Sequence, residues 1–316
     1  MDRPSDRFRL IHEIEQDSAN TLSVTELCRL NGVSRSGYYS WKSSEAAREA
    51  REAQDKADFE VVLAAFLKGG RKKGARQIYM VLQHMDPPVT FNLKKIRRLM
   101  KKYGLECPIR KANPYRRMAK AMRTDSISPN LVQRKFTEAG PRKILLTDIT
   151  YIPFNGKFVY LSTILDAYTR QILAHVVSDN LKIDFVLETV GQLLLNHGDE
   201  LETDVILHSD QGCHYTSVSF RELLKDKKLR QSMSRKGNCW DNAPQESFFG
   251  HMKDEIRDEL KSCKSYMEVK ELLDEQIRYY NEERYQWKLA RLSPDEFYEY
   301  QKTGVYPIKG GKEDKE

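Results

Sequence analysis

Strand-forming and helical patterns alternate along the second half of the chain. The strand patterns are rich in Val, Ile, Leu, Tyr and Thr, and the helical patterns are long enough to cross a sheet. Their order is strand at 143–152, 157–168 and 171–178, helix at 183–198, a strand within 204–212, helix at 217–226 and strand at 230–234. Three consecutive strands followed by alternating helices and strands predict an α/β sheet with helices on its faces.

Two aspartates lie in or just after these strands. Asp148 is inside the first strand, beside Leu146 and Ile149. An ionised carboxylate in a central strand is costly unless a cation or strong hydrogen-bond donors meet it. Asp210 follows the apolar strand that contains Val205 and Leu207. We expect it at the carboxyl end of that strand, where open α/β sheets bind ligands.

A third carboxylate is carried by the stretch "GNCWDNAPQESFFGHMK", residues 237–253. A helix is predicted to begin near Pro244, with Glu246 in its first turn, and 35 residues separate Asp210 from Glu246. A single acid in such a place is usually a helix cap or an ion-pair partner. Three carboxylates without clustered sulfur or imidazole ligands favour Mg²⁺ or Mn²⁺ over Zn²⁺. Two such ions can stabilise the attacking and leaving oxygens of a phosphoryl displacement.

The net charge of +7 is unevenly distributed. Residues 61–123 hold 17 Lys or Arg residues and only two acidic residues, with aromatic side chains interleaved. Concentrated positive charge gains affinity for a polyanion through counterion release, so nucleic acid is the favoured partner. An anionic membrane surface is the second candidate, but no strong amphipathic anchor supports it.

The sequence predicts a soluble, cytoplasmic protein without a membrane partner. No apolar run approaches the roughly 18–20 residues of a membrane-spanning helix, and no signal peptide opens the chain. The five cysteines form no C-x-x-C pair, which suits free thiols in a reducing compartment.

Residues 23–43 have the spacing of a helix-turn-helix. Leu27 and Leu30 supply the inner face of the first helix, the Asn-Gly pair at 31–32 permits a turn, and Ser34 is a plausible cap for the second helix. The candidates to enter a DNA groove from that second helix are Arg35, Ser36 and Tyr38. Residues 45–68 then predict a charged helical connector.

A second helical unit follows the connector. One helix is predicted from Ala75 to His84, and Thr90 can cap another over "FNLKKIRRLMKKYG", which stops at Gly104. Residues 105–137 are expected to form an extended basic linker. The predicted phosphate contacts in this part of the chain are Arg71, Lys72, Lys73, Lys94, Lys95, Arg97, Arg98, Lys101, Arg116 and Arg117.

These motifs together resemble one family. The runs "LLTDITYI", "HSDQGCHYTS", "SRKGNCWDNAPQESFFGHMKDE" and "YYNEERYQWKLARLSPDEF" are similar to those of the DDE transposases of bacterial insertion sequences, specifically insertion sequence family three. These transposases are relatives of the retroviral integrases. The runs "CRLNGVSRSGYYSWK" and "RQIYMVLQ…KKIRRLMKKYGL" resemble the helical DNA-binding segments of the same family. The resemblance covers nearly the whole chain.

The resemblance implies a fold and a site. The fold would be an α/β RNase H-like (integrase-type) catalytic core preceded by all-α helix-turn-helix DNA-binding segments. Asp148, Asp210 and Glu246 would be the catalytic, metal-binding triad for two Mg²⁺ ions, with Mn²⁺ able to substitute. Lys253 matches the basic position seven residues after the glutamate. Gln286 stands where many members have histidine, which puts nothing catalytic in doubt.

The resemblance also implies an activity and partners. The protein would bind double-stranded DNA at the ends of an insertion element, cleave it, and join a 3′-hydroxyl to a second strand in the element or a target. A homo-oligomer on DNA, associated with the bacterial nucleoid, is expected. Many members are made as a fusion with an upstream reading frame, so the product of such a frame is a further possible partner or fusion segment.

Two other function classes share some of these features. A nuclease of the RNase H superfamily would keep the carboxylates but only hydrolyse, and it would not need two helical DNA-binding units. A domesticated DNA-binding protein would keep the helices, but the intact triad argues against it. Joined products would identify a transposase, shorter products alone a nuclease, and binding without chemistry a DNA-binding protein.

The predicted domains are an N-terminal helix-turn-helix at 1–44, a connector with the basic helical unit and linker at 45–137, a catalytic core at 138–260, and C-terminal helices with a polar tail at 261–316. The C-terminal helices either support the core or mediate protein contacts.

Two residues of the loop before the last core helix are further candidates for DNA contacts. Trp240 stacks on a DNA base or packs against the core, and Asn242 is a predicted DNA contact. Asp166 ends a predicted strand and is expected to be a structural turn carboxylate and not a metal ligand. The histidines and cysteines near the site fit no zinc-binding spacing.

Overall fold

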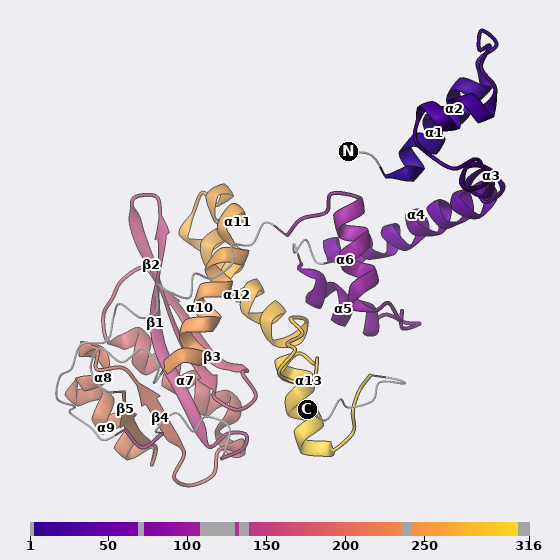
Figure 1. Cartoon of the computed structure of the whole chain (residues 1–316). Helices are drawn as coiled ribbons and strands as arrows, with labels where there is room; N and C mark the ends of the chain where they lie inside the picture. The colour runs from indigo at the N-terminus through magenta and orange to yellow at the C-terminus, as the bar shows by residue number, and fades with distance from the viewer. Residues whose placement is uncertain (1–2, 69–72, 108–129, 133–138, 235–241, 309–316) are drawn as a thin grey trace. The chain divides into compact units, whose positions relative to one another are not determined.

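The computed structural model describes residues 3–68, 73–107, 130–132, 139–234 and 242–308 (Figure 1). The chain divides into two compact units. The first consists of residues Met1–Ala65 and Arg97–Leu105, and the second of Phe66–Ile96 and Glu106–Glu316. No helix within the described ranges has the length and apolar character needed to cross a membrane.

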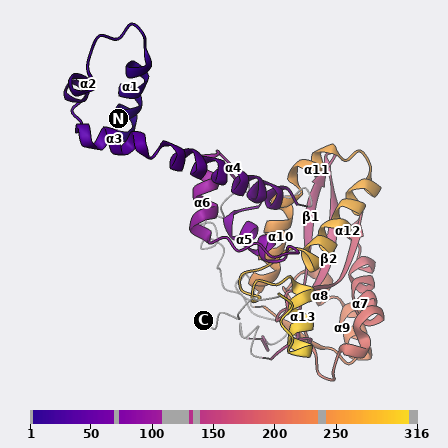
Figure 2. The ribbon, with the colours of Figure 1, turned by 90° about the vertical axis from the view of Figure 1, so that its right-hand side faces the viewer.

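The first unit is helical. Its elements are α1 (Pro4–Gln16), α2 (Val24–Leu30), α3 (Arg35–Ser43), most of α4 (Glu45–Leu67) and the second half of α6 (Leu93–Lys102). The predicted helix-turn-helix is confirmed, since Gly32 takes a positive φ of 62° in the turn and Ser34 caps α3 by accepting from Gly37 N–H. Figure 2 shows α1 beside α2 and α3.

Helix α1 was not predicted, and it changes the role of Tyr38. Ile11 of α1 and Tyr38 of α3 belong to one buried cluster, in which the Tyr38 side chain is 0% exposed. The Tyr38 hydroxyl donates to the Glu15 carboxylate, which also accepts from Lys42 Nζ at 2.7 Å. The hydrogen bond from Lys42 and that from Tyr38 lower the pKa of Glu15. The prediction that Tyr38 enters a DNA groove is therefore wrong.

Helix α6 begins three residues later than its predicted cap. Asn92 Oδ1, and not Thr90, accepts from the N–H of Lys95 at 2.7 Å, and the helix starts at Leu93. Asparagine is a stronger cap than threonine, which explains the shift. Gly104, with a φ of 66°, follows the helix as predicted.

The second unit contains a five-stranded sheet in the order β3-β2-β1-β4-β5. The strands are β1 (Ile144–Phe154), β2 (Lys157–Asp166), β3 (Ile172–Ser178), β4 (Ile206–Ser209) and β5 (Arg230–Met233). β1, β2 and β3 pair antiparallel, whereas β4 pairs parallel to both β1 and β5. The predicted α/β fold is confirmed, including every strand and its order in the chain.

Helices cover both faces of the sheet (Figure 1). One face buries Leu145 and Ile164 against α7 and α9, and the other buries Leu146 and Leu165 against α10 and α12. The helical elements that lie wholly in the second unit, within the described ranges, are α5 (Ala75–Gln83), α7 (Asp184–His197), a 3₁₀ turn η3 (Gly198–Glu200), α8 (Cys213–Thr216), α9 (Val218–Asp226), α10 (Ala243–Glu255), α11 (Arg257–Ser262), α12 (Tyr266–Glu282) and α13 (Pro294–Thr303). Because α12 packs on the sheet, a helix beyond residue 260 completes the hydrophobic core.

Helix α5 also belongs to the second unit, where it packs on the segment that follows α12. Gln77 Nε2 donates to the carbonyl of Tyr285 at 2.8 Å. The rings of His84 and Tyr285 stack with their centroids 3.7 Å apart, and Tyr79 lies 5.9 Å from Trp287. These contacts fix α5 by a hydrogen bond and by aromatic packing.

Asp166 has the structural role that its position predicted. It is completely buried, and its carboxylate accepts from the backbone N–H of Tyr168 and from both the N–H and Nη1 of Arg142. Arg142 also bonds Glu200 through Nε at 3.0 Å. This buried ion pair joins the end of β2 to the start of β1.

Replacing Asp166 by Asn should destabilise the second unit by about 3 kcal/mol, the low end for breaking a buried ion pair, because Arg142 keeps its bond to Glu200. Denaturant unfolding followed by circular dichroism measures the change. Asp226→Asn is the matched control, since its ion pair with Lys227 is exposed and should contribute less than about 1 kcal/mol. Equal stability of the two variants would contradict a structural role for the buried pair.

Candidate active site

Asp148 lies in β1 at the same level as Asp210 beyond β4. The parallel register pairs Leu146 with His208, so each aspartate lies two residues further along its own strand. Adjacent strands are separated by about 4.8 Å. The parallel pairing of β1 with β4 therefore brings together two carboxylates that are far apart in the sequence.

The electrostatics of Asp148 reflect this arrangement. Burial, together with the negative charges of Asp210 and Glu246, raises its pKa to about 7. The backbone N–H of Ile149, which donates to Asp148 Oδ1 at 2.8 Å, and the charge of Lys253 oppose the rise. The charges of Asp210, Glu246 and Lys253 therefore all act on the Asp148 carboxyl.

Asp210 is exposed and is oriented by the turn that follows it. Its Oδ1 accepts from the N–H of Gly212 at 2.8 Å. A Cβ atom placed on Gly212 would lie 2.9 Å from the same oxygen, closer than such contacts allow. Glycine at this position lets the carboxylate fold back onto the turn. Gly212 was not predicted as a site residue, although Asp-x-Gly is a known turn signature.

Glu246 lies in the first turn of α10 and is exposed. The inner stripe of this helix consists of Gln245, Phe248, Phe249 and Met252, all buried. Phe249 therefore packs in the core and not on the face of Glu246.

Gln245 is the one polar residue in that stripe. Its Nε2 donates to Thr163 Oγ1, and Thr163 is the cross-strand partner of Asp148 in the β1–β2 register. The bond thus ties the residue before Glu246 to the residue beside Asp148. A polar residue in an otherwise apolar helical stripe was the available sequence signal.

Lys253 is half-buried on the same helix. Burial lowers its pKa, and the charge of Asp148 opposes that shift. Between Glu246 and Lys253 lies Gly250, where an added Cβ would meet no atom within 4 Å. The helix surface beside Gly250 is therefore open.

The charges of Asp210 and Glu246 both act on the Asp148 carboxyl. Within the described ranges, no group of three or more His, Cys, Asp or Glu side chains could hold a metal ion as they stand. Asp148 Oδ1 and Asp210 Oδ1 each accept a hydrogen bond from a backbone N–H group. All three candidates offer oxygen atoms, the donor type that Mg²⁺ prefers.

The predicted DNA contacts in the basic helices differ in availability. Arg35, Ser36, Lys94, Arg97 and Lys101 are exposed.

Other cations of α6 already have partners. Arg98 makes a two-pronged ion pair with Asp55, and Lys102 bonds both Glu52 and Asp55. Lys95 is half-buried, with Nζ 4.0 Å from the ring centroid of Phe91. These pairs reduce the positive charge that one side of α6 offers to a phosphate.

Three predicted contacts are buried, so the prediction that they touch DNA is wrong. Tyr38 is one. Lys73 is 5% exposed and its Nζ donates to the carbonyl of Lys68 at 2.5 Å. Asn242 is 5% exposed at the start of α10. The exposed aromatic side chain on α3 is Tyr39, under the guanidinium of Arg35. Arg71, Lys72, Arg116, Arg117 and Trp240 lie outside the described residues.

Family models match most of the described chain. Two integrase core domain models match residues 138–239 and 227–294, and an HTH-like domain model matches residues 53–113. The HTH-like match falls on the second, basic helical unit. Integrase core domains carry out polynucleotidyl transfer and generally use divalent metal ions.

Several solved structures are similar at low sequence identity. The catalytic core domain of BIV integrase is 17% identical with a TM-score of 0.40, and the alignment covers 52% of this chain and 97% of that one. A simian T-cell lymphotropic virus intasome chain is 11% identical with a TM-score of 0.46, covering 76% of this chain and 78% of that one.

Relatives of known sequence are much more similar. InsK of insertion sequence element IS150 from Escherichia coli (strain K12) is 34% identical over 71% of this chain and 76% of its own length. Transposase InsF for insertion sequence IS3A from the same organism is 29% identical over 90% of this chain and 96% of its own length. The fold, the domain models and these relatives agree, and the chain belongs to the DDE transposases of the IS3 family.

Proposed function

We propose that Asp148, Asp210 and Glu246 form the catalytic centre with which this transposase cleaves and joins DNA strands. The observation that carries the proposal is the electrostatic coupling of the three carboxylates at Asp148. The β1–β4 register and the packing of α10 hold them together. Three carboxylates that are distant in the sequence would thus form one negatively charged site.

The donor set fits Mg²⁺. A cation would relieve the repulsion that, with burial, raises the pKa of Asp148, and three carboxylates without soft ligands favour hard divalent ions. Asp148, on which the charges of both other acids act, would contact two ions, while Asp210 and Glu246 would each complete the ligand sphere of one. Bound Mg²⁺ would supply charge stabilisation at the attacking and leaving oxygens of a phosphodiester, and Mn²⁺ could replace it.

The substrate would be double-stranded DNA at the ends of the insertion element. In the first step, water attacks the phosphorus and the bond to the 3′-oxygen breaks, which leaves a 3′-hydroxyl and a 5′-phosphate. In the second step, that 3′-hydroxyl attacks a phosphodiester of another strand, whose own 3′-oxygen leaves. The chain's residues bind the phosphates and hold the two reacting groups in line.

The exposed cations of the helical units would hold DNA away from the reacting bond. Lys94, Arg97 and Lys101 on α6 would contact phosphates, and Arg35 with Ser36 on α3 would reach a groove. Joining two element ends would need at least two copies of the chain, so a homo-oligomer on DNA is part of the proposal. The product of an upstream reading frame is a further candidate partner.

Hydrolysis alone, as in a nuclease, is the competing activity, and the relatives do not favour it. A denaturing gel with labelled element ends, Mg²⁺ and the protein separates the two. Products longer than the input are expected from strand transfer. Shorter products alone would contradict it.

Replacing Asp148 by Asn, Asp210 by Asn or Glu246 by Gln should each abolish cleavage and joining while DNA affinity changes little. Each change removes a metal-ligand charge but almost no volume. Gel analysis of labelled ends measures the chemistry, and mobility shift measures binding. Near wild-type joining by any one variant would show that its position is not catalytic.

Replacing Gln245 by Leu should lower the joining rate at saturating DNA by about ten- to a hundredfold, the usual effect of losing a group that orients a ligand. Leucine fills the same buried stripe but cannot donate to Thr163. The Mg²⁺ concentration for half-maximal rate should rise, because Glu246 would be held less firmly.

Gln276→Leu is the matched control for this positioning role. Gln276 is also a buried glutamine, and it donates to Glu255 at 2.7 Å, away from Asp148. Its loss should lower stability without changing the Mg²⁺ dependence. If Gln245→Leu likewise changes only stability, Gln245 has no positioning role.

Lys253 would bind a phosphate next to the scissile bond. Lys253→Ala should therefore lower cleavage and joining by more than it weakens binding of uncut DNA. Lys261→Ala removes the same charge from an exposed ion pair with Asp258 and should leave both quantities unchanged. Full activity of Lys253→Ala at saturating DNA would place Lys253 outside the site.

A further inference from the structure

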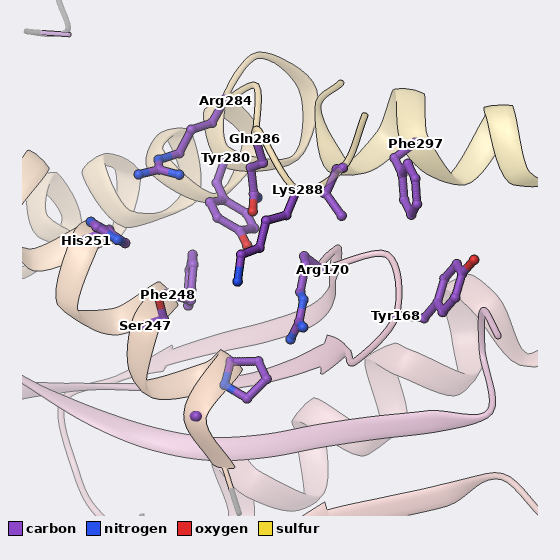
Figure 3. A pocket seen from close by; sticks show the side chains of 13 residues that line it. Tyr168, Arg170, Ser247, Phe248, His251, Tyr280, Arg284, Gln286, Lys288 and Phe297 are labelled. Carbon is purple, nitrogen blue, oxygen red and sulfur yellow. The ribbon is translucent and has the colours of Figure 1, made fainter. Parts of the chain in front are cut away.

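A cavity of about 710 Å³ opens beside α10 (Figure 3). Pro244, Ser247 and Phe248 of α10 form one wall. The turn after β2 and the segment after α12 form the others. Among the residues that line it, three are Arg or Lys and none is Asp or Glu: the cations are Arg170, Arg284 and Lys288.

Arg170, which lines this cavity, has an unfavourable backbone conformation. Its φ is 66°, a region that favours glycine and that an arginine adopts only at a cost. Its Nη1 is buried and has no hydrogen-bond partner within the described parts of the chain. The carboxylate of nearby Asp166 is already bonded to Arg142. A buried guanidinium in this situation favours an external anion.

Lys288 approaches the same space from the segment after α12 (Figure 3). It is exposed and makes no ion pair with any residue that the structure describes. Arg284 differs, because its Nε donates to Glu255 at 2.8 Å. The cavity therefore contains two cations, Arg170 and Lys288, that have no carboxylate partner among the described residues. They come from different elements.

Aromatic rings complete the lining. Phe248 and Tyr280 meet edge to face with centroids 4.6 Å apart, and Tyr168 stacks on Phe297 at 5.9 Å. A small inorganic anion would use the two cations but would have no use for these rings. A nucleotide would use both, because its phosphate pairs with cations and its base packs on aromatic faces.

We propose that this cavity binds a nucleotide of the DNA strand adjoining the scissile phosphate, with its phosphate between Arg170 and Lys288 and its base against the aromatic side chains. The inference rests on the proposed function, which places the scissile phosphate at Glu246. Ser247 lines the cavity and is the next residue after Glu246. A strand that leaves the active site around the first turn of α10 would enter the cavity.

The test is binding of a short single-stranded oligothymidylate carrying 5-iodouracil to the full-length Asp148→Asn protein, which cannot cleave it. Arg170→Gly combined with Lys288→Ala should weaken binding by about tenfold or more, as loss of charged hydrogen bonds predicts. Glycine is favoured at a φ of 66°, so the turn should fold without strain. Lys264→Ala, at another exposed lysine, should bind as tightly as the parent.

Photo-cross-linking locates the bound strand. Cross-links to peptides containing Tyr168 or Phe297, the partly exposed rings of the lining, are expected. Cross-links confined to residues 75–105, or unchanged affinity of the double variant, would overturn the proposal. Competition with inorganic phosphate distinguishes a site for a DNA strand from a site for a small free anion. Phosphate that binds as tightly as the oligothymidylate would show a small-anion site and would also overturn it.

Failure of this inference is distinguishable from failure of the proposed function. The binding and cross-linking measurements need no catalysis, so they can succeed or fail whatever the triad does. Joining activity that survives in Asp148→Asn would overturn the catalytic assignment and leave the cross-linking result unchanged.

Discussion

The mutual repulsion of Asp148, Asp210 and Glu246 is the constraint that the second unit has to withstand. Like charges in a partly buried site would separate if the backbone were free to move. The parallel pairing of β1 with β4 fixes the first two. The third is fixed by α10, whose Phe248, Phe249 and Met252 pack into the core on one face of the sheet. Apolar packing and strand register thus stabilise an unfavourable charge arrangement.

Helix α10 divides its residues between three environments by its periodicity. Gln245, Phe249 and Met252 are buried, the charges of Glu246 and Lys253 reach Asp148, and Pro244 and Ser247 line the cavity. At about 100° per residue, neighbours in sequence point to different sides. One helix therefore carries Glu246, part of the core and part of the cavity wall, and a shift of α10 would disturb all three.

Local patterns predicted the strands, the order of the sheet elements and the α10 carboxylate, because each depends on residues close in sequence. Contacts between distant segments could not be predicted in this way. Tyr38 was assigned to DNA because α1, which buries it, carries no strong pattern. The exposed neighbour Tyr39 differs by one residue, which on a helix means a different face. The cavity combines residues 168–170, 243–251 and 280–297, and no single stretch indicates it.

The segment after α12 links two surfaces that no sequence pattern connects. Tyr285 and Trp287 contact α5 of the region matched by the HTH-like model, whereas Gln286 and Lys288 line the basic cavity. Successive residues of this short segment therefore face opposite sides. A displacement of α5 acts on the backbone of Tyr285, where Gln77 is hydrogen bonded, and so on the residues beside it. The contacts of α5 and part of the cavity lining therefore lie on one short stretch of backbone.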